Sequence, residues 1–349
     1  MTEDKGKQTI IIKNIYYMLS YAFRSIKANG VNDIASEDFE NIHDLFAEIL
    51  IRGITPLTKG GLQHGYIQKR EALSSINGRI NDSETSKQLT LLQGKIICDF
   101  DEFAVDILPN QILKSAVHLL IYHADVTSAR KKKLKGLLMF FDTVSKISPT
   151  TIQWNALRNQ RMSNAYKTLI NFCRFVINGL LLTTQDGKYK LTAWIQDGQM
   201  EYLYEKFVFN YYEKHHPCFN PERPYINWNT LPGVKSRYLP TMRTDIVLTE
   251  GERQLIIDTK YYRRGTMQSK ESYHSKDLYQ MYAYVKNYDI NSTGNVAGML
   301  LYAMTDERLT PDEDIVIAGN RISLKTLNLN SNWQEITEQL DQLCGWLRE

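Results

Sequence analysis

Residues 243–260 read Arg-Thr-Asp-Ile-Val-Leu-Thr-Glu-Gly-Glu-Arg-Gln-Leu-Ile-Ile-Asp-Thr-Lys. Two apolar runs flank a short polar turn that contains a glycine, and this pattern predicts a β-hairpin. Asp245 and Asp258 stand inside the expected strands, where strand propensity alone disfavours acidic residues. Because side chains alternate along a strand, Asp258 and Lys260 share one face of it. This hairpin decides the fold of the C-terminal half of the chain.

The register of the hairpin decides whether its charged residues meet. If the turn is centred on residues 250–251, Asp245 lies opposite Ile256, on the face that carries Asp258 and Lys260. A slip of one residue would scatter the three charged side chains over both faces. Charges gathered on an apolar hairpin are costly unless a cation or a substrate uses them. We therefore expect a functional site on this face.

The order Asp, Asp-x-Lys resembles the core of the PD-(D/E)xK nucleases, which implies Mg²⁺-dependent hydrolysis of a phosphodiester. Asp245, Asp258 and the backbone carbonyl of Thr259 would hold the cation, because Mg²⁺ prefers oxygen ligands. Lys260 would orient or activate the attacking water and offset charge on the phosphate. The competing interpretation is a surface hairpin whose charges merely pair.

Two further stretches carry candidate site residues. Gln280 and Tyr284 lie one turn apart on the same face of an expected helix. They resemble the Q-x-x-x-Y motif that follows the active site in a subset of these nucleases and positions DNA. Glu205, in the expected helix before the hairpin, is either a further acidic site residue or a residue that caps or solvates its helix.

The bulk properties are those of a globular protein with room for two cores. The chain has 349 residues, of which 43% are hydrophobic and 23% charged, and a formal net charge of +3 that permits nucleic-acid contact without indicating it. The four cysteines are scattered, which argues against a disulfide framework or a zinc site. Neither a signal peptide nor a membrane span is recognisable, so we expect a cytoplasmic protein. A P-loop motif is absent, so nucleotide binding by this chain is not expected.

Ser148-Pro149-Thr150 interrupts the helical pattern and is the expected domain boundary. It divides a mixed α+β domain at residues 1–150 from an α/β nuclease domain at residues 151–349. Helices are expected at residues 15–24, 38–52, 108–124, 156–181, 200–213, 275–288 and 332–347. Strands are expected at residues 9–13, in the hairpin and at residues 296–302, 315–317 and 322–324, with a small sheet or barrel around residues 60–80.

Two other features have ordinary explanations. The basic cluster from Ala129 to Lys135 is either a solvated helix face or, as the minority interpretation, a phosphate-contacting face. His215-His216-Pro217-Cys218 has metal-binding residue types, but adjacent histidines on an irregular segment more often cap or solvate a loop.

Several stretches together resemble the McrC family, the nuclease subunits of McrBC-type, 5-methylcytosine-directed restriction systems. They are Lys13-Asn-Ile-Tyr-Tyr-Met-Leu-Ser-Tyr-Ala22, Ile76-Asn-Gly-Arg-Ile80, Asp101-Glu102, Asn110 to Lys114, Leu203-Tyr-Glu-Lys-Phe207, Thr244-Asp245, Ile257 to Tyr262 and Leu278 to Tyr284. The resemblance covers nearly the whole chain. One departure concerns Glu205, since some family members carry Gln there.

The resemblance implies a partner. McrC-like proteins work with a separate AAA+ GTPase hexamer, McrB, which binds the GTP and reads the methylated double-stranded DNA. The N-terminal part of McrC enters the pore of the GTPase ring and stimulates hydrolysis, and the C-terminal domain then cuts DNA with Mg²⁺. Two alternatives stay open: a regulatory subunit with a silent nuclease, and a stand-alone nuclease.

Overall fold

The protein has a mixed α/β fold made of two compact units. The computed structural model describes residues 14–23, 39, 41–183, 189–191, 197–230, 238–261, 275–304 and 311–349. Residues 14–23 and the described residues from 197 onward form one unit, which we name the sheet unit. The described residues from His43 to 191 form the other, the arm unit. None of the described helices combines the length and apolarity needed to cross a bilayer.

The sheet unit is built on a five-stranded sheet in the order β11-β12-β10-β9-β8. These strands are β8 (Ile246–Glu250), β9 (Arg253–Lys260), β10 (Val296–Ala303), β11 (Glu313–Ile317) and β12 (Asn320–Leu327). The pairs β8–β9 and β11–β12 are antiparallel, whereas β10 is parallel to both β9 and β12. The apolar runs of β9 and β10 are buried on both faces, as is typical of central strands.

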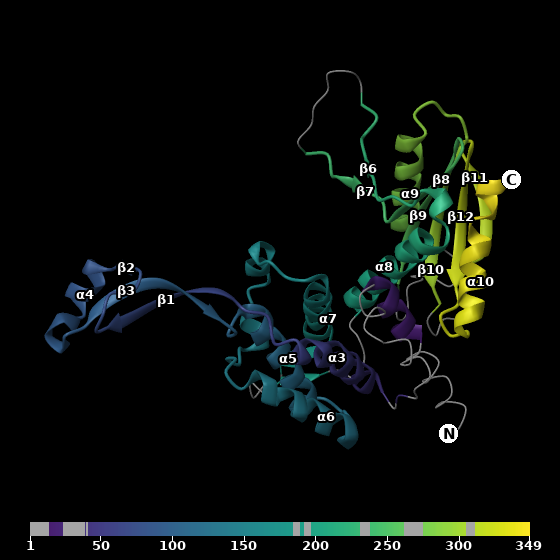
Figure 1. Cartoon of the computed structure of the whole chain (residues 1–349). Coiled ribbons are helices and arrows are strands. Elements are labelled where there is room, and N and C mark those ends of the chain that lie inside the picture. The colour runs from purple at the N-terminus through teal and green to yellow at the C-terminus, as the bar shows by residue number, and fades with distance from the viewer. Residues whose placement is uncertain are drawn as a thin grey trace. The chain divides into compact units, whose positions relative to one another are not determined.

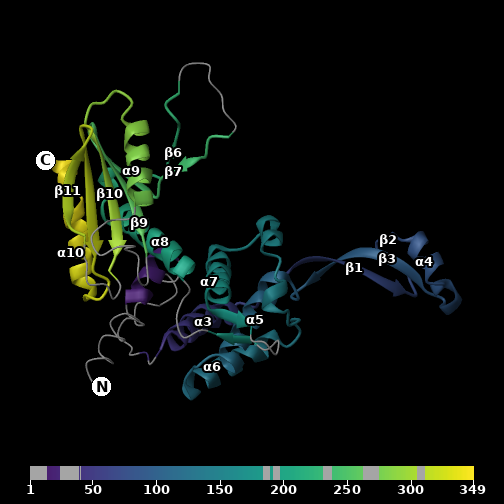
Figure 2. The ribbon, with the colours of Figure 1, turned by 180° about the vertical axis from the view of Figure 1, so that it is seen from behind.

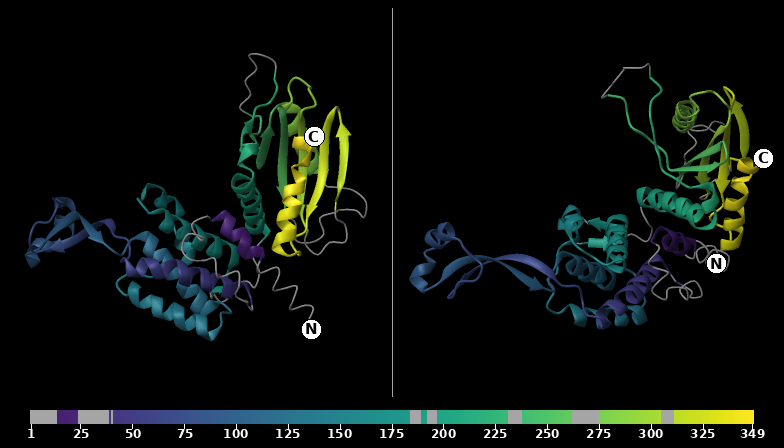
Figure 3. Two further views of the ribbon diagram at one scale, coloured as in Figure 1. Left: turned by 45° about the vertical axis from the view of Figure 1, so that its right-hand side comes forward. Right: turned by 45° about the horizontal axis from the view of Figure 1, so that its top comes forward.

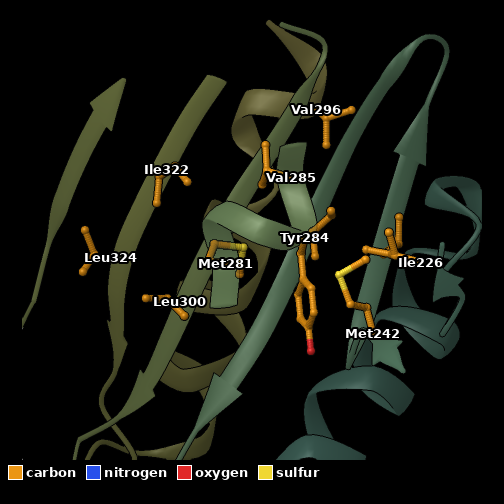
Figure 4. Packing of buried hydrophobic residues seen from close by; sticks show 11 residues of the cluster. Ile226, Met242, Met281, Tyr284, Val285, Val296, Leu300, Ile322 and Leu324 are labelled. Atoms are coloured by element: carbon orange, nitrogen blue, oxygen red, sulfur yellow. The ribbon is translucent and has the colours of Figure 1, made fainter. Parts of the chain in front are cut away.

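Helices cover both faces of this sheet. α9 (Ser275–Tyr288) packs on one face, and Figure 4 shows its Met281 and Val285 against Leu300 and Ile322 of the strands. α10 (Trp333–Leu343) lies on the opposite face, as both views of Figure 3 show. The remaining elements of the unit are α8 (Asp197–His215), which contacts β9, α11 (Gly345–Arg348), β6 (Tyr225–Ile226), β7 (Met242–Arg243) and the 3-10 turn η6 (Pro217–Phe219).

An N-terminal helix over residues 14–22 completes the sheet unit. The Asn14 side chain donates hydrogen bonds to the carbonyls of Leu329 and Ser331 at 2.7 and 2.8 Å. Tyr17 stacks on Trp333 with 4.4 Å between ring centroids. The assignment of this helix to the first domain was therefore wrong, because its buried face packs on the C-terminal helices. The strand expected at residues 9–13 lies outside the described residues.

The arm unit combines a helical body with a three-stranded sheet in the order β1-β3-β2. Figures 1 and 2 show β1 and β3 as a long twisted ribbon that leaves the helices and carries α4 near its far end. The helices are α3 (Ile42–Lys59), α4 (Asp82–Lys87), α5 (Leu108–His123), α6 (Ser128–Leu138) and α7 (Asn164–Leu180). The strands are β1 (Gly65–Leu73), β2 (Arg79–Ile80), β3 (Ile96–Ala104), β4 (Leu181–Thr183) and β5 (Tyr189–Leu191). Short 3-10 turns occur at Thr90–Gln93, Met139–Phe141, Pro149–Thr151 and Trp154–Asn159.

Two predictions for this region were wrong. The helix expected to stop at Gly53 continues to Lys59. This glycine serves packing instead, because a Cβ there would lie 2.4 Å from Leu169 Cδ2 of α7. The expected boundary at residue 150 is only a 3-10 turn inside the arm unit, and α7 beyond it belongs to the same core. Phe172 of α7 packs edge-on against Phe46 of α3 at 5.5 Å. The division into units falls near residue 193 instead.

Candidate active site

The hairpin forms as predicted, but with a register shifted by two residues. Thr249 pairs with Gln254 and Ile246 with Ile257, so continuing the ladder by one step places Asp245 opposite Asp258, not Ile256. The two-residue loop is residues 251–252, because Gly251 supplies the positive φ of 58° at its first position. A shift of two residues preserves which side chains share a face, so the predicted convergence of the charged residues is retained.

Asp245 is fixed by the neighbouring strand. Its Oδ2 accepts hydrogen bonds from the backbone N–H and the hydroxyl of Thr259, both at 2.8 Å. Since β8 begins only at Ile246, this carboxylate takes the place of a strand carbonyl as the partner of a buried N–H. The Thr259 carbonyl leaves the strand on the same side as its N–H, so it faces Asp245 as well.

Asp258 and Lys260 form a buried ion pair. Asp258 is 3% exposed, and its Oδ2 lies 2.5 Å from Lys260 Nζ without the directed geometry of a hydrogen bond. Burial raises the pKa of Asp258 to about 7, since the lowering effect of Lys260 is partly cancelled by Asp245. Burial lowers the pKa of Lys260, but the nearby carboxylates, led by Asp258, outweigh it and the net shift is upward. Lys260 is therefore a cation at neutral pH.

Gln280 and Tyr284 extend this cluster from α9. Gln280 Oε1 accepts a hydrogen bond from Lys260 Nζ at 3.2 Å, and its Nε2 approaches Asp258 Oδ1 at 3.4 Å. The same Nε2 donates to the Tyr284 hydroxyl at 2.7 Å. This hydroxyl in turn donates to the Arg243 carbonyl at 3.0 Å. The two α9 residues thus share one face and join the hairpin cluster, as their spacing predicted.

Glu205 lies beside the cluster but is engaged elsewhere. Its Oε1 accepts a hydrogen bond from Arg223 Nη1 at 2.5 Å. Burial, and then the charge of Asp245, raise the pKa of Glu205, while Arg223 lowers it. The structure therefore brings Glu205 within electrostatic reach of Asp245, with its carboxylate paired to an arginine.

The donor set suits a hard cation. Asp245, Asp258 and the Thr259 carbonyl offer oxygen only, and two carboxylates that face each other repel unless a cation lies between them. Within the described ranges no group of three or more His, Cys, Asp and Glu side chains is placed to hold a metal ion, so water and phosphate oxygens would complete the coordination of a bound Mg²⁺.

The other candidate clusters have structural partners. His215 Nε2 lies 2.7 Å from the Tyr21 hydroxyl, and His216 Nε2 lies 2.7 Å from Asp341 Oδ1. These contacts agree with the structural interpretation of the histidine pair. In the basic cluster, Arg130 binds Glu48 of α3 at 3.3 Å, whereas Lys132, Lys133 and Lys135 are exposed. That pattern suits a solvated helix face.

Comparison with known proteins identifies the family. The family model described as "McrBC 5-methylcytosine restriction system component" matches residues 3–303. The chain belongs to this family. The resemblance to McrC is thereby confirmed.

A curated relative and two solved structures also resemble this McrBC component. The Escherichia coli K12 protein described as "Type IV methyl-directed restriction enzyme EcoKMcrBC" is 28% identical over 336 residues, which span 95% of this chain and 96% of the relative. A half-complex of Thermococcus gammatolerans McrB AAA+ hexamers with bound McrC gives a TM-score of 0.48 at 13% identity, covering 94% of this chain and 75% of the other. The cryo-EM structure of the McrBC complex from the same organism gives 0.38 at 16% identity, covering 60% of each chain.

One residue of this McrBC component joins the site without having been predicted. Asp277, in the first turn of α9, is 3% exposed and has its Oδ1 3.8 Å from Lys260 Nζ. Its spacing was a usable signal, because residues 277, 280 and 284 follow the i, i+3, i+7 pattern of one helix face. Arg223, the partner of Glu205, had no such signal, since it lies in an irregular segment.

Proposed function

We propose that this chain is the DNA endonuclease subunit of a GTP-dependent, modification-dependent restriction complex. The observation that carries the proposal is the convergence of Asp245, Asp258 and Lys260, from two paired strands, with Gln280 from α9. The strand order supports a PD-(D/E)xK fold for the sheet unit, with the charged residues at the end of the β8–β9 hairpin remote from its turn.

Asp245, Asp258 and the Thr259 carbonyl would hold Mg²⁺. When bound, this ion polarises a phosphate oxygen and lowers the pKa of water. Lys260 is held as a cation by its acidic neighbours, so it offsets negative charge on the phosphate and orients water instead of accepting a proton. Gln280, already bonded to Lys260 and Tyr284, keeps α9 in register with the hairpin and offers polar groups to the DNA backbone.

The arm unit would dock to an AAA+ GTPase partner and stimulate it. Large apolar side chains are exposed near the far end of the ribbon, including Leu89, Leu91 and Leu92, at 63%, 63% and 84%. Exposed apolar clusters of this kind mark surfaces that a partner covers. McrC is bound to McrB AAA+ hexamers in the Thermococcus half-complex, and we propose a partner of the same kind for this family member. Methylated double-stranded DNA is the proposed substrate, with its modification read by the partner.

The test reconstitutes the full chain with an McrB-like GTPase and follows DNA cleavage and GTP turnover together. Asp258→Ala is expected to abolish cleavage while GTPase stimulation persists. Asp312→Ala removes a carboxylate that is 79% exposed and pairs with Lys325 on the same sheet, so this control variant should cut normally. Cleavage by Asp258→Ala would refute the active-site assignment. Absence of cleavage by the unaltered complex would favour the regulatory alternative.

To test the docking role of the arm unit, a deletion must leave the sheet unit intact. Deleting residues 1–150 would also remove helix 14–22 from the sheet unit. Tyr66 lies opposite Phe103, so residues 67–102 can be replaced by a two-residue Asn-Gly turn. This shortened chain is expected to lose GTPase stimulation while the unfolding of its sheet unit is unchanged. Retained stimulation would refute the docking role.

A further inference from the structure

The Lys260 ammonium is held from three sides inside the sheet unit. Its side chain is 11% exposed, and Nζ lies 2.5 Å from Asp258 Oδ2, 3.2 Å from Gln280 Oε1 and 3.8 Å from Asp277 Oδ1. Two of these neighbours are carboxylates and one is a neutral amide. A buried ammonium depends on such partners, because an uncompensated buried charge is strongly destabilising.

The position of Asp277 is set by two elements. It lies in the first turn of α9, where the helix dipole favours a negative side chain. The Tyr302 hydroxyl donates to Asp277 Oδ2 at a long 3.5 Å, and Tyr302 is the direct neighbour of Lys260 across the parallel β9–β10 pair. Helix α9 and strand β10 therefore bring this carboxylate to the ammonium independently of the hairpin.

The two carboxylates differ in what else they do. Asp258 faces Asp245 and belongs to the proposed cation site, so a bound cation would draw on the same oxygens that now face Lys260. Gln280 contributes no charge. Asp277 lies on α9, is not among the proposed cation ligands, and has its Oδ1 3.8 Å from Lys260 Nζ.

We propose that Asp277 is a positioning residue whose carboxylate holds the Lys260 ammonium in place once Asp258 ligates the cation. This inference rests on the proposed function, since it presumes that Lys260 acts on the phosphate. Asp277 touches neither the metal nor the DNA in this scheme. Its effect reaches the reaction only through Lys260.

The kinetic test uses Asp277→Asn in the full chain with its GTPase partner. Losing the charge at nearly constant shape is expected to lower kcat for cleavage about 10- to 100-fold, the range typical of residues that support ligands and catalytic groups. The Kd for DNA and the Mg²⁺ concentration for half-maximal rate should change little. Asp277→Glu, which keeps the charge, should retain more activity than the Asn variant.

A matched control lies at the other end of the same helix. Asp289 is also buried but binds Thr293, Gly294 and Asn320, far in sequence from the hairpin. Asp289→Asn should lower stability and leave kcat per folded molecule unchanged. If Asp277→Asn behaves like this control, Asp277 is only structural and the proposal fails. If Asp258→Ala also still cuts, the proposed active site itself is wrong.

A readout that needs no cleavage follows Lys260 directly. In ¹⁵N-labelled protein, the side-chain ammonium signal of Lys260 should stay visible in the unaltered chain with and without Mg²⁺. In Asp277→Asn, and not in Asp289→Asn, this signal should broaden or vanish when Mg²⁺ is added. An unchanged Lys260 signal in Mg²⁺-loaded Asp277→Asn would overturn the proposal, whatever the complex does to DNA.

Discussion

Gly298 sets the distance between α9 and the sheet, and replacing it with Ala tests how tightly that distance controls the site. Gly298 lies in the middle of β10, where its nearest side chains are Met281 and Val285 of α9. A Cβ at this position would meet Met281 Sδ at 2.5 Å and Val285 Cγ2 at 2.8 Å. Ordinary contacts between such atoms are about 3.5–4.0 Å, so the added methyl needs roughly 1 Å of extra room.

The two neighbouring side chains, Met281 and Val285, differ in how easily they can move to make that room. Met281 has a flexible side chain and can swing aside, but Val285 is β-branched and holds one rotamer in a helix. The helix itself must therefore move. Overpacking of this kind costs about 1–3 kcal/mol in the free energy of unfolding. A shift of about 1 Å would also separate Gln280 from Lys260, and misplacements of this size can slow a reaction on the order of 100-fold.

Chemical denaturation and DNA cleavage measure the two effects. Gly298→Ala should lower the free energy of unfolding and reduce kcat more than DNA binding. Gly136, an α6 glycine with no heavy atom within 4 Å of its added Cβ, is the matched control: Gly136→Ala should leave stability unchanged or raise it by up to about 1 kcal/mol. Shortening Met281 to Ala in the Gly298→Ala background should recover part of the loss. A Gly298→Ala protein that unfolds and cuts like the unaltered one would show that α9 is not fixed by this contact.

Two further predictions concern buried polar groups of the sheet unit. Burial opposes ionisation of Asp289, but hydrogen bonds from Asn320, Thr293 and Gly294 outweigh it and lower its pKa from 3.8 to about 2. A lowered pKa stabilises the fold only while the group is ionised. Above pH 4 the free energy of unfolding of the unaltered protein should therefore be about 1–3 kcal/mol larger than that of Asp289→Asn. In acid titrations of thermal unfolding this difference should fade as the pH falls toward 2, and a pH-independent difference would contradict the assignment. Asn14→Ala removes the donor to two carbonyls near Trp333 and should lower the free energy of unfolding by about 1–3 kcal/mol. Tryptophan fluorescence during chemical denaturation measures this loss. Unfolding identical to the unaltered chain would show that helix 14–22 does not stabilise the sheet unit.

The hairpin shows what a sequence pattern can and cannot decide. The alternation of side chains fixed which residues share a face, so the grouping of Asp245, Asp258 and Lys260 could be predicted. The exact partner of Asp245 could not, because it depends on where Gly251 sits in the turn. An error of two residues in the predicted register did not change which side chains share a face, since side chains alternate between the two faces of a strand with a period of two.

Contacts between segments that are distant in the sequence could not be predicted from local sequence patterns. The pattern around Gly53 predicted the end of a helix, but the close approach of Leu169 of α7 explains why a glycine stands inside the helix. Pro149 reads as a domain boundary, although it only turns the chain inside one core. In both cases a breaker residue serves packing, which composition alone does not reveal.

The placement of helix 14–22 bears on how the docking role can be tested. Its sequence is among the stretches most like the McrC family, yet its contacts are with Leu329, Ser331 and Trp333 at the C-terminal end of the chain. The described part of the sheet unit therefore combines helix 14–22 with the residues from 197 onward, and the described part of the arm unit lies between them in the sequence. Removing the N-terminal residues would therefore disturb the sheet unit itself, which is why the docking role is tested by shortening the ribbon instead.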